Sequence, residues 1–178
     1  GIEKKHIIPY TYPTDDELKK VGVTGLFLGH YIPWDSMSNA LVAQVNGFNT
    51  YNKVVEGSMV NYENLDNYQT GIHDYFKFLK FGFGRATDIA CTHIRRGRIT
   101  RQDGLNAVKK LDGLFPWEYL GKSLEEILKP LEITVEEFIK ICDQFTNKKI
   151  FKRDSSGKLI KNRNGDLTKI NYDNKWKS

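Results

Sequence analysis

The segment from Gly71 to Arg101 constrains the fold of this chain most strongly. It reads GIHDYFKFLKFGFGRATDIACTHIRRGRITR. Apolar residues recur in its first half at helical spacing: Ile72, Tyr75, Phe76, Leu79 and Phe83. This spacing predicts an amphipathic helix. Gly82 and Gly84 interrupt it, and a shorter pattern then runs from Arg85 to Gly97, where glycine is a typical helix end. The segment therefore predicts two consecutive helices.

The same segment is basic. It holds seven Lys and Arg residues against two Asp, which gives a net charge of +5. Residues 147–178 hold eight Lys and two Arg against three Asp, a net charge of +7, so the rest of the chain sums to −7 within the total of +5. The positive charge is therefore local. Two interpretations of the helix pair stay open: a rigid surface that faces an anion, or a core helix pair with a solvated basic side.

The rest of the chain predicts further helices and little sheet. Capping boxes at Thr14 and Thr134 mark two helix starts. Residues 23–29, VTGLFLG, are short, apolar and bounded by glycine, which predicts a buried strand. Two similar turn units, KRDSSGKLIK and KNRNGDLTK, predict a basic β hairpin or meander after residue 148, whose lysines would protect a strand edge. The predicted fold class is α+β and mainly helical, and the helices after Thr100 are assigned no chemistry.

Length and cysteine content limit the class of protein. A chain of 178 residues can bury the core of one domain. No stretch reaches the roughly 18 to 20 apolar residues of a membrane-spanning helix, so we expect no membrane segment. Cys91 and Cys142 form neither a CxxC pair nor a disulfide pattern, which favours the reducing cytoplasm. We divide the chain into a helical domain, residues 1–147, and a basic β hairpin or tail, residues 148–178.

Most short motifs of known chemistry are missing from the sequence. The four histidines lack metal-ligand spacing, so we predict no metal-binding residue. Gly82-Phe83-Gly84 lacks the third glycine of a dinucleotide-binding fingerprint, and there is no GxxxxGK[ST] loop. Arginines gather around Gly97, where they would contact the phosphates of a nucleic acid. The acidic flanking segments argue against a nucleic-acid partner, which is kept as an alternative.

Four runs of sequence together resemble a known family. They are GVTGLFLGHYIPWD, YENLDN, GIHDYFKFLKFGFGRATD and RRGRITR, and the likeness extends from about Tyr12 to about Arg153. They are similar to the C-terminal half of N-acetyl sugar amidotransferases, PP-loop ATP pyrophosphatases of lipopolysaccharide and flagellin-glycan pathways. The resemblance implies the C-terminal part of an α/β PP-loop fold. The family's SGGxDS-like phosphate loop and its cysteine pairs do not occur here, so we expect a fragment or C-terminal domain.

The resemblance also implies an activity. ATP with Mg²⁺ would activate the acetamido oxygen of a nucleotide-linked N-acetyl sugar as an adenylate, and ammonia from a partner glutaminase would displace AMP and leave an acetamidino group. The N-terminal PP-loop half would hold most of the ATP phosphates, so we expect this chain alone to be inactive. The implied partners are that N-terminal half, the glutaminase subunit and the nucleotide-linked sugar. A non-catalytic docking module for the glutaminase or the N-terminal half is the alternative.

Ten residues become candidates for the site. His73 and Asp74 begin the matched helix and receive the catalytic role, with His73 as a proton carrier or sugar ligand. The other candidates are assigned to substrate or phosphate binding: Arg85, Lys77, Lys80, Trp34, Asp35, Asn64, Asp66 and Asp88. Arg85 is the best anion-binding candidate, because the Gly-x-Gly bend before it allows close backbone approach to a ligand.

Several of these candidates have a structural alternative. Lys77 and Lys80 would face a diphosphate or AMP, or else lie on a solvated helix face with His73. Trp34 would touch base or sugar, or else belong to the core. Asp88 would orient the arginine or cap the next helix.

Overall fold

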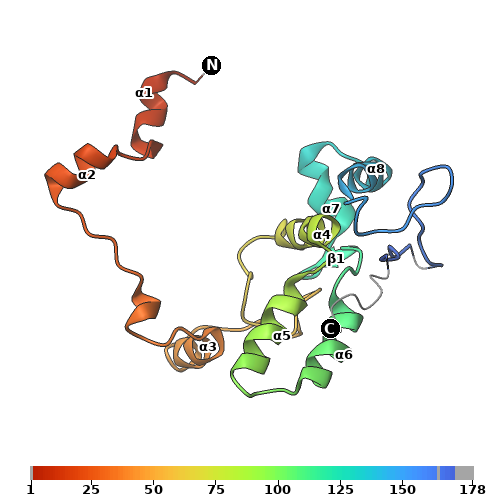
Figure 1. The fold of residues 1–178 in the computed structure, drawn as a ribbon, viewed down its shortest axis with the longest axis horizontal. Coiled ribbons are helices and arrows are strands. Elements are labelled where there is room, and N and C mark those ends of the chain that lie inside the picture. The colour runs from red at the N-terminus through yellow and green to blue at the C-terminus, as the bar shows by residue number, and fades with distance from the viewer. Residues whose placement is uncertain (1, 164, 171–178) are drawn as a thin grey trace, which may run out of the picture. The chain divides into compact units, whose positions relative to one another are not determined.

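The structure, a computed structural model, describes residues 2–163 and 165–170. Within these residues it contains eight α-helices, three short 3₁₀ helices and one two-stranded antiparallel sheet, so the predicted mainly helical α+β class is confirmed (Figure 1). The chain forms two compact units, one up to Asn46 and one from Gly47 onward. This division follows compactness, and the functional boundary at residue 148 stays a prediction. None of the described helices combines the length and the apolar composition that crossing a bilayer requires.

The first unit contains three short helices. Thr14 caps the second of them: its hydroxyl accepts the Glu17 N–H at 3.3 Å and the Glu17 carboxylate accepts the Thr14 N–H at 2.8 Å. This confirms the predicted capping box. Asp35 caps the third helix, because its Oδ1 accepts the Ser38 N–H at 2.9 Å. The helices are α1 (Lys4–Ile7), α2 (Asp15–Val21) and α3 (Ser36–Val45).

The prediction of a strand near residues 23–29 is wrong. Residues 23–27 run without regular secondary structure and Leu28–His30 form a 3₁₀ helix. Phe27, in the middle of the run, is 91% exposed. An apolar run becomes a strand only when a neighbouring strand takes up its backbone groups, and none of the described residues does so here.

The second unit confirms the central helix pair. Gly82, with φ of 77°, ends the first helix, and Gly97, with φ of 67°, follows the second. Both are left-handed conformations that glycine adopts without strain. The capping box at Thr134 is also formed. The elements are α4 (Thr70–Phe81), α5 (Arg85–Arg95), α6 (Arg101–Leu111), β1 (Glu118–Tyr119), β2 (Lys122–Ser123), α7 (Leu124–Leu128) and α8 (Val135–Phe145).

The core of the second unit lies where α4 packs on α7 and α8, while α5 and α6 pack on each other (Figure 1). It is rich in aromatic rings, with the ring centroids of Phe78 and Phe151 5.4 Å apart. Such pairs add stability beyond the apolar area they bury. The fully buried aliphatic and phenylalanine members of this core come from three separate segments, namely α4, α7 and the tail: Leu79, Leu124, Leu128 and Phe151.

After residue 148 the chain makes two successive reversals, as in the predicted meander rather than in a single hairpin. Hydrogen bonds of 3.0 Å close them, from the Gly157 N–H to the Asp154 carbonyl and from the Gly165 N–H to the Asn162 carbonyl. The two turn units thus fold alike. Single antiparallel bridges replace a continuous ladder: Phe151 with Lys169, Arg153 with Leu159 and Lys161 with Leu167. The end of the predicted hairpin, residues 171–178, lies outside the described residues.

We expect only one of the two cysteines to react with Ellman's reagent in the folded protein. Cys91 is exposed, whereas Cys142 is 3% exposed and packs in the core. Burial raises the pKa of the Cys142 thiol to about 12, and the thiolate is the reactive form. One thiol per chain should therefore react in buffer and a second after denaturation. Rapid reaction of both thiols in buffer would show that the core is open around α8.

Candidate functional site

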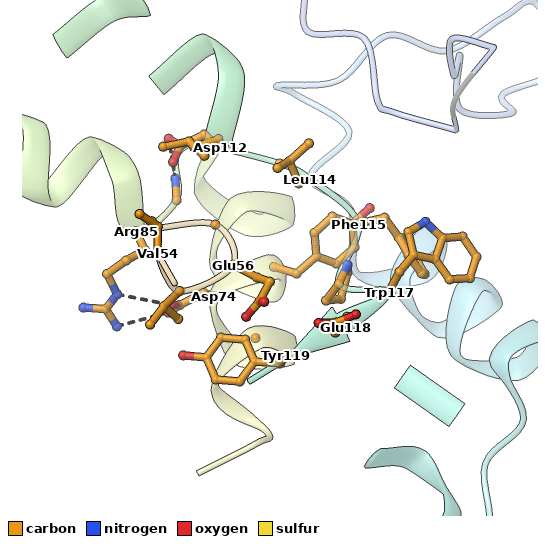
Figure 2. A pocket seen from close by; sticks show the side chains of 18 residues that line it. Val54, Glu56, Asp74, Arg85, Asp112, Leu114, Phe115, Trp117, Glu118 and Tyr119 are labelled. Atoms are coloured by element: carbon orange, nitrogen blue, oxygen red, sulfur yellow. Dashed lines mark hydrogen bonds and ion pairs between the residues drawn. The ribbon is translucent and has the colours of Figure 1, made fainter. Parts of the chain in front are cut away.

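A cavity of about 350 Å³ lies within the second unit. Its wall is formed by residues 54–57, by α4, by the start of α5 and by residues 111–119 (Figure 2). The volume falls in the range of small-molecule sites, which is about 300 to 1,000 Å³. The lining combines aromatic rings with a few charged groups, as expected for a site that holds an organic ligand in one orientation.

Tyr119 forms one side of this cavity. It is 2% exposed, and its hydroxyl donates to the carbonyl of Asn64 at 3.2 Å. Gly71 of α4 lets the ring lie close, because a Cβ there would stand 2.6 Å from the Tyr119 ring. The N–H of Leu120 donates to Glu56 Oε2 at 3.0 Å. The loop 54–57 and strand β1 are thereby fixed to each other and to α4.

Asp74 and Arg85 form a bidentate pair at the cavity. Arg85 Nε donates to Asp74 Oδ2 and Nη2 donates to Oδ1, both at 3.1 Å (Figure 2). Both side chains are mostly buried. Burial alone would lower the pKa of Arg85, but the hydrogen bonds and the charge of Asp74 outweigh it and raise that pKa. The pair therefore links α4 to the first residue of α5.

Asp112 fixes the start of α5 from 28 residues away. Its carboxylate accepts the Gly84 N–H at 2.8 Å, the Thr87 N–H at 3.3 Å and the Thr87 hydroxyl at 2.5 Å. The two N–H groups are among the backbone donors that a helix leaves unpaired at its first turn. Asp112 therefore caps the start of α5, a role predicted for Asp88 as one of two alternatives. The carboxylate of Asp88 instead pairs with the ammonium of Lys77, so the expectation that Asp88 caps a helix is wrong.

Of the ten predicted residues, Asp74 and Arg85 line the cavity. His73 lies beside them, with Nδ1 3.2 Å from Asp74 Oδ1, but its side chain is 74% exposed. Lys77 pairs across to α5, whereas the ammonium of Lys80 lies 5.6 Å from the centroid of the Phe145 ring. The helix therefore presents these three basic side chains to different neighbours.

The remaining candidates are more scattered. Asn64 contributes its backbone carbonyl, which accepts the Tyr119 hydroxyl, and the charge of Asp66 is among those that raise the pKa of Tyr119. Trp34 and Asp35 belong to the first unit, where the carboxylate of Asp35 caps α3. Their contact with the base or the sugar stays a prediction.

Sequence analysis missed the segment 111–119, which supplies half of the wall. One signal was available. The run Phe115-Pro-Trp-Glu-Tyr119 places three aromatic residues and a glutamate within five positions, and such a density is unusual for a plain turn. Asp112 carried no such signal, because its partners are distant in sequence.

The charges around the cavity are mostly negative. Four carboxylates line it against one guanidinium: Glu56, Asp74, Asp112 and Glu118 against Arg85. Asp74, Asp112 and Glu56 Oε2 already accept hydrogen bonds within the protein, so Glu118 and Oε1 of Glu56 remain as acceptors for a ligand. Such a cavity favours hydroxyl donors and cations over phosphate groups. Within the described residues, no group of three His, Cys, Asp or Glu side chains is placed to hold a metal ion.

We expect Tyr119 to lose its proton only near pH 12. Burial, followed by the charge of Asp74, raises its pKa from 10.0 to about 12. Between these values the unfolded chain releases the proton and the folded chain keeps it. The stability contribution is therefore full below pH 10 and falls as the pH rises from about 10 to about 12.

Ultraviolet titration of the phenolates measures this step. Tyr119→Phe should remove one late-titrating phenol and reduce the loss of stability above pH 10. Tyr75→Phe is the matched control, because burial also raises the pKa of Tyr75 and its removal should leave the Tyr119 step in place. An unchanged titration curve for Tyr119→Phe would contradict the burial of this phenol.

Comparison with known proteins identifies the family of the chain. No curated protein matches the chain. A family described as LPS biosynthesis protein WbpG-like, C-terminal domain, matches residues 49–164. The matched region covers more than half of the chain and contains every residue of the cavity wall. The chain therefore belongs to the WbpG-like C-terminal domain family of lipopolysaccharide biosynthesis proteins.

Proposed function

We propose that this chain is the C-terminal portion of an ATP-dependent N-acetyl sugar amidotransferase. The enzyme would convert the acetamido group of a nucleotide-linked sugar to an acetamidino group, with ammonia from a glutaminase subunit. The family's role in lipopolysaccharide biosynthesis supports a substrate of this class. The N-terminal PP-loop half and the glutaminase are the partners of this proposal, and the cytoplasm is its setting.

The cavity is the observation that carries the proposal. Phe115 and Trp117 offer flat apolar surfaces to the faces of a sugar ring, and Glu56 and Glu118 offer acceptors to its hydroxyl groups. A docking module would need no such cavity, nor an arginine–carboxylate pair at its wall. The cavity therefore favours the enzyme over the docking module.

The cavity does not suit the phosphates of ATP. Its carboxylates outnumber its single guanidinium, and no cluster in the described residues is placed to bind Mg²⁺. We therefore assign ATP and Mg²⁺ to the PP-loop half, outside this chain. When bound there, ATP would supply the chemistry that turns the amide oxygen into a leaving group.

Within this proposal, the residues of the chain position the sugar and move a proton. Asp74 fixes the Arg85 guanidinium through two hydrogen bonds and contacts the imidazole of His73. An exposed imidazole at the rim, oriented by a carboxylate, can accept the proton that attacking ammonia loses. Arg85 would donate its remaining N–H groups to the sugar or to the oxygen that leaves.

The function is tested by AMP release. This chain should release no AMP from ATP, ammonium and a panel of nucleotide-linked N-acetyl sugars. Addition of the N-terminal half should give AMP and the acetamidino sugar in equal amounts. Ammonium replaces the glutaminase as the source of ammonia in this assay, so the amidation step is measured without the glutaminase activity. Turnover by this chain alone, or AMP release without an acetamidino product, would overturn the proposal.

A further inference from the structure

The C-terminal tail carries a second hollow, of about 470 Å³, that is open to solvent. Three cationic side chains line it: Lys148, Lys152 and Arg153. Its apolar lining comes from Phe151, Ile160 and Ile170. This basic groove lies in a stretch, residues 147–170, that holds eight Lys and Arg against two Asp. The charge of the tail is thus gathered at a concave surface.

Lys152 is the central residue of the basic groove. Its backbone is fixed on both sides, because its N–H donates to the Thr168 carbonyl at 2.8 Å and its carbonyl accepts the Ile160 N–H at 3.0 Å. Its side chain is half-buried, yet in the described part of the chain its ammonium meets neither a carboxylate nor another hydrogen-bond acceptor. A cation that lies in a concave surface and meets no anion among the described residues favours an anion from outside.

The carboxylate at the rim of the groove is already occupied. Asp154 Oδ1 accepts the Ser156 N–H at 2.9 Å, the Ser156 hydroxyl at 2.7 Å and the Lys158 N–H at 3.0 Å. These hydrogen bonds, that of the Ser156 hydroxyl first, lower the pKa of Asp154, and the groove still holds three cationic side chains against this one carboxylate. Asp154 therefore serves the turn, and the cations of the groove remain available to a ligand.

The second turn of the tail packs against the candidate site. A small cavity of about 90 Å³ is lined by Phe115 and Trp117 of the first cavity and by Lys161 and Gly165 of the tail. The tail therefore lies against the aromatic wall of the candidate site. Lysines that only protect a strand edge would have no reason to line a hollow.

We propose that the basic groove is a binding site for a phosphate group, recognised by Lys152 and Arg153 with Lys148 at the rim. Arginine binds phosphate oxygens through a planar fork and lysine binds them as a point charge. The ligand is a phosphate monoester or diphosphate, whether of a free metabolite or of a lipid headgroup. This inference goes beyond the proposed function and stands without it.

Binding of inorganic pyrophosphate to the full chain tests the free-metabolite form. Calorimetry should show saturable binding that weakens with salt. Lys152→Gln and Arg153→Gln should each weaken it about tenfold, as expected for a lost charge-assisted contact. Lys158→Gln is the matched control, because it removes the same charge from an exposed position of the same turn, outside the groove. Circular dichroism of each variant checks the fold.

Vesicles test the lipid form. Sedimentation with phosphatidylcholine vesicles, with and without phosphatidic acid, whose headgroup is a phosphate monoester, should show binding only to the vesicles that contain phosphatidic acid, and Lys152→Gln should reduce it. Either arm supports the site and identifies the source of the phosphate. Absence of binding in both arms, or an equal loss in Lys158→Gln, would overturn the proposal, because the second result is that of unspecific charge attraction.

Discussion

Gly113→Ala is expected to cost about 2 to 5 kcal/mol of unfolding free energy, from left-handed strain and overpacking together. The residue has φ of 84°, and a Cβ there would stand 2.3 Å from the Phe78 ring. Phe78 belongs to the core around α4 and is 6% exposed, so its ring must shift against packed neighbours. The loss is a large part of the stability of a typical domain, about 5 to 15 kcal/mol. Urea unfolding, followed by circular dichroism, measures it.

Gly97→Ala is the control for this experiment. Gly97 is also left-handed, with φ of 67°, but a Cβ there meets nothing within 4 Å. Its substitution should cost only the backbone strain, about 1 to 2 kcal/mol. The difference between the two variants isolates the contact with Phe78. Equal losses would mean that the ring moves aside freely and that the cavity wall is not close-packed at this point.

The helices could be predicted from the sequence because their signals are local. The capping boxes at Thr14 and Thr134 depend on residues three positions apart, and the glycines at 82 and 97 act on their own turn of helix. The amphipathic pattern of α4 is likewise local, because it indicates only that this segment is a helix and which of its faces is buried. Such signals predict a helix independently of how the rest of the chain folds.

The predictions that failed or were missed depend on distant partners. The run 23–29 has the composition of a strand but no paired strand in the described structure. The cavity is built by contacts across 28 residues between Gly84 and Asp112 and across 64 residues between Glu56 and Leu120. No local pattern encodes these pairs. Resemblance to a family therefore found Asp74 and Arg85, and it did not find the residues that surround them.

Arg85→Lys in the complete enzyme is expected to lower kcat/KM for AMP release about tenfold or more. The bidentate geometry with Asp74 requires the planar guanidinium, and lysine keeps the charge without the fork. A lost charge-assisted contact of about 1.5 to 3 kcal/mol corresponds to this change in rate. Unfolding free energy should fall by a similar amount, because Asp74 is mostly buried and loses its partner.

The ion pair of Lys77 with Asp88 provides the control that separates activity from stability. It joins the same two helices, one turn further along, and neither residue lines the cavity. Asp88→Asn should therefore lower the unfolding free energy and leave kcat/KM within about twofold, since partly exposed ion pairs contribute about 1 kcal/mol or less. If Asp88→Asn reduces the rate as much as Arg85→Lys does, helix docking alone explains the loss. If Arg85→Lys destabilises the protein at an unchanged rate, Arg85 is a structural residue and the sugar must be bound by other groups.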